Sequence, residues 1–266
     1  MRKARRVVGS ALAVAAFWAV SCRDIPAPDN GVQSISALIL GSPGLVAGDT
    51  LRDSLGFAAP LNVIAYGTDN EPVDPQPTPL FVVLDTGAFL ADGRYLVGET
   101  PGTRVRIVGQ VGGLQTLPDT VVVTLSPDAL VATDSTTHHI TFAPFDTAAL
   151  AVLNTRVLHF AATDTSGVEA VIVRYAIVDA PPGIGTAPTA ILLNNRVQSD
   201  RDTTDNTGRA SRTARLRRLA SVDFTEDTVI VNSTASYRGS SIGTVQFVLV
   251  FRKTVPPPAA GTSSNQ

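Results

Sequence analysis

Two stretches of the chain resemble each other and indicate its fold: Leu61-Asn-Val-Ile-Ala-Tyr-Gly-Thr-Asp-Asn-Glu-Pro-Val73 and Leu158-His-Phe-Ala-Ala-Thr-Asp-Thr-Ser-Gly-Val168. Each is an apolar run that reaches Ala, followed by a Thr-Asp turn and then by a second apolar run. A Gly-Arg turn follows in both copies, at Arg94 and at Arg209. The offset between the copies grows from 97 residues at the first motif to 115 at the second. We therefore predict an internal repeat with a longer middle section in its second copy.

The residues on either side of these motifs have a β pattern. From Val32 onward, short runs rich in Val, Ile, Thr and aromatic residues alternate with Gly, Pro, Asp and Asn, and no helical period is evident. Such runs favour half-buried strands, and many short strands separated by turns favour sandwiches. The expected strands are 34–40, 61–66, 80–84, 104–111, 120–125, 138–142, 156–161, 170–177, 212–216, 228–235 and 244–251.

The two copies resemble bacterial immunoglobulin-like domains. In the first copy, Tyr66-Gly-Thr-Asp-Asn-Glu-Pro-Val73 and Gly98-Glu-Thr-Pro-Gly-Thr-Arg-Val-Arg-Ile107 are similar to group 2 of that family. In the second, Thr163-Asp-Thr-Ser-Gly167 and Asn206-Thr-Gly-Arg-Ala210 are similar to the group 1, invasin-like type. The resemblance implies an all-β fold of two tandem immunoglobulin-like sandwiches and a structural, adhesion or surface-interaction role.

The N-terminus has the pattern of an export signal. Arg2, Lys3, Arg5 and Arg6 precede an apolar run over 7–20, which is shorter than the roughly 20 residues that span a bilayer. Ala19-Val20-Ser21-Cys22 resembles the lipobox of bacterial lipoproteins and contains the only cysteine of the chain. The resemblance implies cleavage between Ser21 and Cys22 and a lipid on Cys22. The alternatives are an uncleaved anchor and a free thiol after ordinary cleavage.

These observations divide the chain into six parts. A tether follows the signal peptide, and a polar stretch with Pro127 separates the two copies. The C-terminal run of proline and small polar residues favours disorder. The expected parts are a signal peptide (1–21), the lipidated cysteine and tether (22–31), domain 1 (32–126), a hinge (127–137), domain 2 (138–254) and a disordered tail (255–266).

One group of arginines is a candidate binding site. Arg212, Arg215 and Arg217 lie in a predicted strand, where they could bind an acidic glycan or a phosphate-bearing surface. Strand alternation places Arg215 and Arg217 on the solvent face, opposite the apolar residues of the strand. The alternative is an ordinary exposed face balanced by the acidic residues that follow.

Metal and enzyme sites are not expected. His138 and His139 are neighbours on a predicted strand and point to opposite faces, which leaves His159 without a chelating partner. The acids at 200, 202 and 205 do not have EF-hand spacing, so a solvated loop is the preferred interpretation over a calcium site. No nucleophile elbow, zinc-protease motif or phosphate-binding loop is present in the sequence. We expect no cofactor and no catalysis.

Charge and composition limit the partners. The formal net charge is −2, so no basic field attracts nucleic acid. The sequence predicts a lipid-anchored cell-envelope protein, on the inner or outer membrane and facing the periplasm or the exterior. It would act as a spacer or adhesion module for an envelope or surface protein or a glycan. The alternative is a carbohydrate- or polymer-binding accessory lipoprotein, which would need exposed aromatic residues on one face. The tyrosines to check for such a face are Tyr66, Tyr95, Tyr175 and Tyr237.

Overall fold

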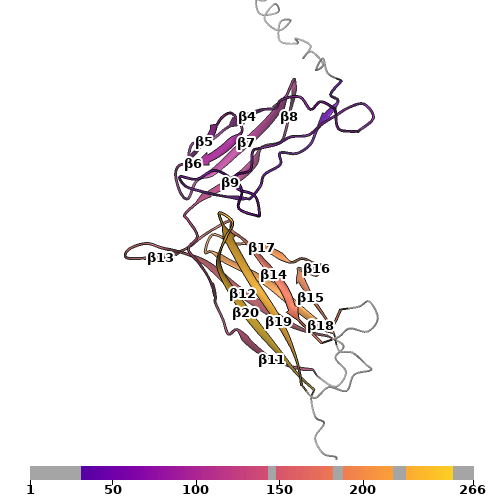
Figure 1. Ribbon diagram of the computed structural model, residues 1–266, viewed down its shortest axis with the longest axis vertical. Helices are drawn as coiled ribbons and strands as arrows, with labels where there is room; N and C mark the ends of the chain where they lie inside the picture. Colours follow the sequence, from indigo (N-terminus) through magenta and orange to yellow (C-terminus); the bar gives the residue numbers. More distant parts are fainter. Residues whose placement is uncertain (1–30, 143–147, 182–187, 218–225, 254–266) are drawn as a thin grey trace, which may run out of the picture.

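The computed structural model consists of two β-sandwiches placed end to end (Figure 1). It describes residues 31–142, 148–181, 188–217 and 226–253. The described chain begins at the free end of the first sandwich and ends at the free end of the second. Every regular element among these residues is a strand, so the chain is an all-β protein. Among the described residues, no helix has the length and apolar character needed to cross a bilayer.

The first sandwich is built around a sheet in the order β2-β9-β7-β4, in which β2 runs parallel to β9. Two small antiparallel sheets, β1-β3 and β5-β6, complete it, and β8 pairs with β7. Alternate residues of β7 and β9, including Val105, Ile107 and Val121, are fully buried in its core. The strands are β1 Ser34–Ile35, β2 Gly44–Val46, β3 Ala65–Tyr66, β4 Leu80–Val83, β5 Ala88–Ala91, β6 Tyr95–Gly98, β7 Arg104–Val111, β8 Leu114–Gln115 and β9 Asp119–Thr124.

The second sandwich has longer strands and two larger sheets. One has the order β10-β12-β18-β15-β16, with β13 paired to β12, and the other has the order β11-β20-β19-β14-β17. The strands are β10 Ala129–Ala132, β11 Thr137–Phe142, β12 Ala148–Phe160, β13 Thr165–Gly167, β14 Ile172–Asp179, β15 Ala190–Asn194, β16 Val197–Gln198, β17 Arg201–Thr203, β18 Arg209–Arg217, β19 Glu226–Tyr237 and β20 Ser240–Lys253.

This strand order follows the immunoglobulin plan. The strands β10, β12, β18 and β15 take the places of A, B, E and D, and the sheet containing β20, β19 and β14 takes the places of G, F and C. The first strand position of the fold is divided between the two sheets. β10 pairs with β12 in one sheet, and β11 pairs in parallel with β20 in the other. Tyr175 and Phe247 are the largest fully buried side chains, and Tyr175 Oη lies 2.8 Å from Thr155 Oγ1 across the two sheets.

The predicted boundary between the domains needs one correction. The expected hinge, 127–137, contains β10, whose four residues pair with β12 from Ala129↔Leu158 to Ala132↔Thr155. Its sequence, Ala-Leu-Val-Ala, is only four apolar residues long and has no alternation that would indicate a strand. Only Leu125 to Asp128 therefore lie between the last strand of the first sandwich and the first strand of the second.

Candidate functional site

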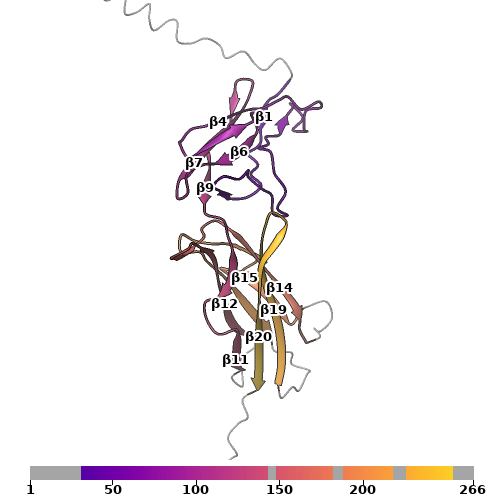
Figure 2. The ribbon, with the colours of Figure 1, turned by 60° about the vertical axis from the view of Figure 1, so that its left-hand side comes forward.

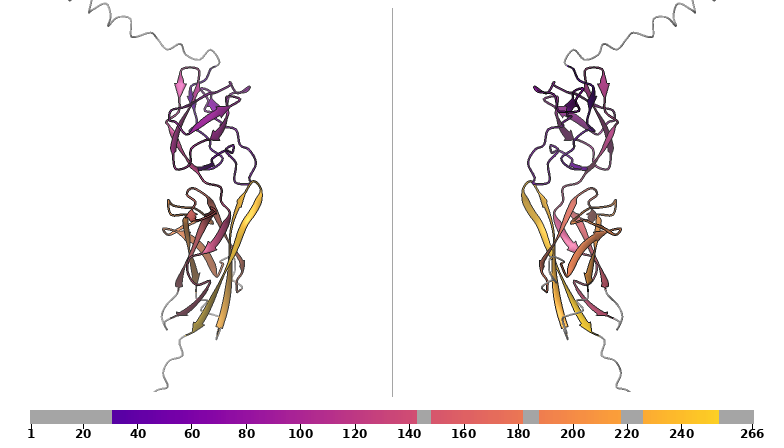
Figure 3. Two further views of the ribbon diagram at one scale, coloured as in Figure 1. Left: turned by 90° about the vertical axis from the view of Figure 1, so that its left-hand side faces the viewer. Right: turned by 90° about the vertical axis from the view of Figure 1, so that its right-hand side faces the viewer.

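The two sandwiches meet at the tip of a hairpin. The strands β19 and β20 extend toward the first sandwich and end in a two-residue turn, Arg238-Gly239, between the paired residues Tyr237 and Ser240 (Figures 2 and 3). Both turn residues have positive φ, 51° and 76°, as type I′ hairpin turns require. The tip contacts the segment that follows β2 in the first sandwich. This junction is the most connected polar cluster between the two domains and is our candidate functional site.

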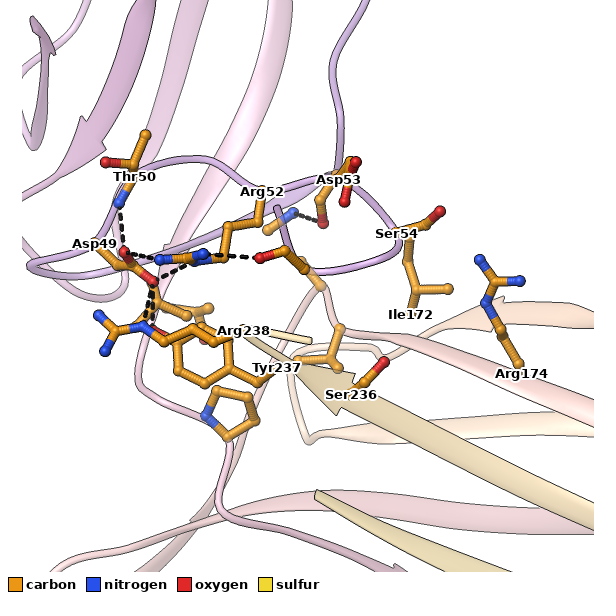
Figure 4. Close-up of a pocket in the computed structure, with 18 of the residues that line it drawn as sticks. Asp49, Thr50, Arg52, Asp53, Ser54, Ile172, Arg174, Ser236, Tyr237 and Arg238 are labelled. Atoms are coloured by element: carbon orange, nitrogen blue, oxygen red, sulfur yellow. Dashed lines mark hydrogen bonds and ion pairs between the residues drawn. The ribbon is translucent and has the colours of Figure 1, made fainter. Parts of the chain in front are cut away.

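A single carboxylate, that of Asp49, lies at the centre of the junction (Figure 4). From its own domain, Asp49 Oδ1 accepts hydrogen bonds from the Thr50 amide at 2.8 Å and Arg52 Nη2 at 2.9 Å, and Oδ2 accepts one from Arg52 Nε at 2.8 Å. From the second domain, Tyr237 Oη donates to Oδ2 at 2.6 Å and Arg238 Nε donates to it at 3.0 Å. Asp49 is only 7% exposed, so its charge is neutralised by this network rather than by water.

The environment changes the acidity of these groups. Burial by itself raises the pKa of Asp49, but hydrogen bonds from Arg52, Arg238, Tyr237 and the Thr50 amide outweigh it and hold that pKa well below its ordinary value. Hydrogen bonding to Asp49 raises the pKa of both Arg52 and Arg238. Burial, the hydrogen bond to Asp49 and the charge of Asp49 raise the pKa of Tyr237 to about 12. Over the neutral and mildly acidic range, Asp49 therefore stays negatively charged, the two arginines stay positively charged and Tyr237 stays protonated.

The titration of Tyr237 tests this network. Because its folded pKa is raised, the stability it contributes is fully present below the unfolded value of about 10 and is lost as the pH rises through about 12. NMR of ring-labelled tyrosine should follow this ionisation, with the Tyr237→Phe variant identifying the resonance. In Asp49→Asn the pKa of Tyr237 should fall toward 10. An unchanged pKa in that variant would show that Asp49 does not face the phenol.

The backbones of the two domains also approach closely. A Cβ added to Gly56, whose φ is +91°, would lie 1.9 Å from the amide nitrogen of Gly239 at the hairpin tip. The loop that carries Gly56 is fixed by Asp53, whose Oδ1 accepts hydrogen bonds from the amides of Leu55 and Phe57, and by Arg52 Nη1, which donates to the Gly56 carbonyl. The hairpin tip therefore lies directly against an ordered loop.

We expect Gly56→Ala to separate the domains without unfolding them. The methyl group can fit neither the positive φ nor the space next to Gly239, so the loop and the hairpin tip must move apart, at a cost of about 1–3 kcal/mol. Small-angle scattering should show a broader range of shapes than for the wild type. Gly48→Ala is the matched control, because Gly48 also has positive φ (+74°) but has open space at its Cβ. If the two variants gave the same scattering, the close approach of Gly56 to Gly239 would not be what holds the domains together.

The connection between the domains is held on both sides. Thr124 is buried at the end of β9, and its carbonyl accepts a hydrogen bond from the Ala47 amide at 2.9 Å. On the second domain, His159 Nδ1 lies 2.9 Å from both the Ser126 carbonyl and Asp128 Oδ2. An ion pair between Arg104 and Glu169 links the two sandwiches beside this connection. The segment 125–128 therefore cannot act as a free swivel in this arrangement.

A pocket at the junction is lined by both domains. Asp53 and Ser54 come from the first sandwich, and Ile172, Arg174 and Ser236 come from the second (Figure 4). The residues that line it include no histidine, lysine or cysteine. Its two carboxylates, Asp49 and Asp53, each accept hydrogen bonds from neighbouring groups of the protein. The arrangement is suited to holding the two domains together by charge pairing and hydrogen bonding.

The structure separates the three arginines of the predicted binding site. Arg212 is wrongly placed in that prediction: its side chain is 4% exposed and lies inside the sandwich, where Nη1 is 3.1 Å from Asp202 Oδ1 of the opposite sheet. Strand alternation explains this position, since Arg212 shares a face with the buried Ala210, Ala214 and Leu216. Arg215 and Arg217 are on the outer face of β18, as predicted.

Other candidate residues are also dispersed. Ser21 and Cys22 lie outside the described residues. Tyr175 is in the core and Tyr237 is in the junction, so the four tyrosines do not form one sugar-binding face. His138 and His139 are consecutive on β11, while His159 holds the connection between the domains. Among the described residues, no group of three or more His, Cys, Asp or Glu side chains has the geometry of a metal site.

Sequence reasoning missed the junction. The Arg238-Gly239 turn between two alternating runs could have indicated a hairpin. Its acceptor, Asp49, is 188 residues away from Tyr237 in a segment without regular periodicity. A contact of that separation depends on how two complete domains meet, and no local pattern encodes it.

Comparisons with known proteins do not assign a family. No family model and no curated protein match the chain. Similar solved structures include domains 4 and 5 of the S-layer protein SbsC, with 14% identity, a TM-score of 0.29, and coverage of 84% of this chain and 99% of that one. The Yersinia pseudotuberculosis adhesin InvE has 15% identity and a TM-score of 0.32, over 84% of this chain and 61% of that one.

A third similar structure is human protocadherin-24 EC1-2, with 10% identity and a TM-score of 0.29, over 85% of this chain and 100% of that one. At these sequence identities and TM-scores, the similarities do not support an inference about function. The strand order and the two cores define the class of protein: an all-β chain of tandem immunoglobulin-like sandwiches.

Proposed function

We propose that this chain is an exported, lipid-anchored cell-envelope protein that acts as a non-catalytic spacer or adhesion module. The junction around Asp49 is the observation that supports this most directly. Two sandwiches joined by a four-residue connection, an ion pair and a buried carboxylate network form an extended unit whose two ends are held apart. A spacer needs such a fixed separation between its attachment point and its binding surface.

The proposed anchor comes from the N-terminal sequence. The basic start, the short apolar run and the position of Cys22 together support lipidation at that residue. Acyl chains add about 0.8 kcal/mol for each buried CH₂ group, so a multiply acylated cysteine would hold the protein at a membrane stably. The first sandwich would then lie nearer the membrane and the second sandwich farther from it.

The mass of the N-terminal peptide tests the anchor. After expression of the full chain in a diderm bacterium, we expect a peptide that begins at Cys22 and carries a diacylglyceryl group. Cys22→Ser should abolish the modification and release the protein from the membrane fraction, while Ser34→Ala, an exposed position in β1, should leave both unchanged. An unmodified peptide from the wild type would contradict the lipid anchor. The spacer role would then depend on whether the two sandwiches keep a fixed arrangement.

A further inference from the structure

The outer face of one sheet of the second sandwich combines aliphatic and basic side chains. Strand register places Leu150 of β12, Arg215 of β18 and Ile191 of β15 in one row across the sheet. The next row contains Val152, Thr213 and Leu193. Leu150 and Val152 are 63% and 50% exposed, which is unusual for large aliphatic side chains on a sheet surface. Arg215 is therefore flanked by the exposed Leu150 on one side and by the partly exposed Ile191 on the other.

The charged residues on the outward strand positions of this face are all arginines. The outward residues of β18 include Arg209, Arg215 and Arg217, and Arg156 of β12 lies directly opposite Arg209. None of the outward-facing positions of β12, β18 and β15 in the described chain is an Asp or a Glu. Arg215 and Arg217 form no ion pair with another described residue, although the chain has 23 acidic residues in all. Loop carboxylates lie only at the Arg209 end of the described face, where Asp134 accepts a hydrogen bond from Asn154. The end with Arg215 and Arg217 therefore carries the unbalanced charge.

These features select among the possible partners. A second copy of the chain docked face to face would place these arginines against each other, which is unfavourable. A sulfated or phosphorylated polymer would satisfy the arginines but would leave Leu150, Val152 and Ile191 against a polar surface. The outward aromatic ring on these strands, Phe160 at the end of β12, lies ten residues along the strand from Leu150, so no ring for sugar stacking lies beside Arg215 among the described residues. A protein surface with both carboxylates and aliphatic side chains satisfies both requirements.

We propose that the outer face of the sheet β12-β18-β15, centred on Arg215, docks an acidic protein partner whose carboxylates are interspersed with aliphatic side chains. The proposal names the partner class for the spacer or adhesion role and rests on that proposed function. Binding would bury the exposed rows of Leu150 and Val152 and pair Arg215 and Arg217 with carboxylates. The junction and the opposite sheet would not be involved.

A designed peptide probes this chemistry. In an extended strand of Glu-Thr-Val-Thr-Glu-Thr-Val-Thr, Glu and Val share one face, because alternate residues point the same way. Titrated into the full-length chain, this peptide should shift NMR resonances of β12, β18 and β15 and leave those of β14 and β19 unchanged. Peptides with Lys in place of Glu, or with Ser in place of Val, should bind at least fivefold more weakly. Vesicles of phosphatidylglycerol should not compete with the peptide.

Two variants of the protein complete the test. Arg215→Glu should weaken peptide binding by about tenfold, because it places like charges in contact. Arg94→Glu, the same charge change at an exposed residue of the first sandwich, should change binding by less than twofold. Unfolding temperatures must agree between the two variants, and if Arg215→Glu is unstable, Leu150→Ser replaces it.

Several results would overturn the proposal. No shift on this face, or equal binding of the Lys and Glu peptides, would rule out an acidic partner. Equal binding of the Ser peptide would remove the aliphatic component. Vesicle binding that depends on Arg215 would identify the face as a membrane contact instead. Because peptide binding does not depend on Cys22 or on the junction, failure here leaves the anchor and the spacer role to their own tests.

Discussion

Replacing Asp49 with asparagine will uncouple the two sandwiches. The change removes the charge that Arg52, Arg238 and Tyr237 share, and it places an amide donor where all three neighbouring groups also donate. Because Arg52 and Arg238 are partly exposed, water compensates part of the lost charge, and the loss of these hydrogen bonds should cost about 1–3 kcal/mol. Denaturant unfolding followed by circular dichroism should change from one coupled transition to two, with the first sandwich, which has the shorter strands, unfolding earlier.

The matched control for this variant is Asp85→Asn. Asp85 also accepts hydrogen bonds from an arginine, Arg106 Nε at 2.9 Å and Nη2 at 2.8 Å, but this pair is exposed and lies within one domain. Solvent screens exposed ion pairs, so the control should alter stability only slightly and keep a single transition. Equal effects of the two substitutions would contradict the central role of Asp49.

The junction should also resist acid. The folded pKa of Asp49 is depressed, so its contribution is fully present above the unfolded aspartate value of about 3.9 and is lost as the pH falls toward the lower folded value. The difference in stability between the wild type and Asp49→Asn should therefore stay constant from neutral pH to about pH 5 and shrink below about pH 4. A difference that disappears near pH 6 would indicate that another group controls the junction.

Substitution of Asp202 by alanine should strongly destabilise the second sandwich. Arg212 is 4% exposed, and its ion pair with Asp202 joins β18 of one sheet to β17 of the other. Arg212 Nη2 also donates to Ser199 Oγ at 3.3 Å, while Nε has no hydrogen-bond partner among the described residues. Without Asp202 the guanidinium would be buried and uncompensated, at a cost of about 3–5 kcal/mol in the free energy of unfolding.

Two further variants make this prediction specific. Asp200→Ala removes a nearby exposed carboxylate that lies 3.6 Å from Arg201, and it should change stability by about 1 kcal/mol or less. The double variant Asp202→Leu with Arg212→Met should recover most of the loss, because an apolar pair of similar size avoids the desolvation of both charges. If Asp202→Ala costs as little as Asp200→Ala, then Arg212 is not buried as described.

Local patterns predict part of the fold: β12 was expected only over 156–161, β15 was not expected, and the junction was not predicted. Long alternating runs predicted β7 with its observed bounds and placed β14, β18, β19 and β20 within a few residues. The short strands β2, β5 and β10 were missed because three or four residues are too few to establish a period of two. Their strand character comes from pairing with distant partners, as β2 does with β9.

In the candidate sites, too, local strand alternation is predictable from the sequence and long-range contacts are not. Alternation along β18 was sufficient to place Arg215 and Arg217 outward, and applied to Arg212 it would also have placed that residue inward. The partners could not be predicted in this way. Asp202 faces Arg212 only because two sheets stack, and Asp49 meets Tyr237 only because two domains dock. Polar residues that are 10 or 188 positions apart carry no sequence signal of such contacts.

The rigidity of the junction can be measured directly with two spin labels. In a Cys22→Ser background, cysteines at Thr120 of β9 and Gln246 of β20 would place one label at an exposed position on each sandwich. Pulsed electron-spin distance measurements should give one narrow distribution for the otherwise native chain and a broad one after Asp49→Asn. A broad distribution in the chain with Asp49 intact would contradict a fixed arrangement of the two sandwiches, and with it the spacer function.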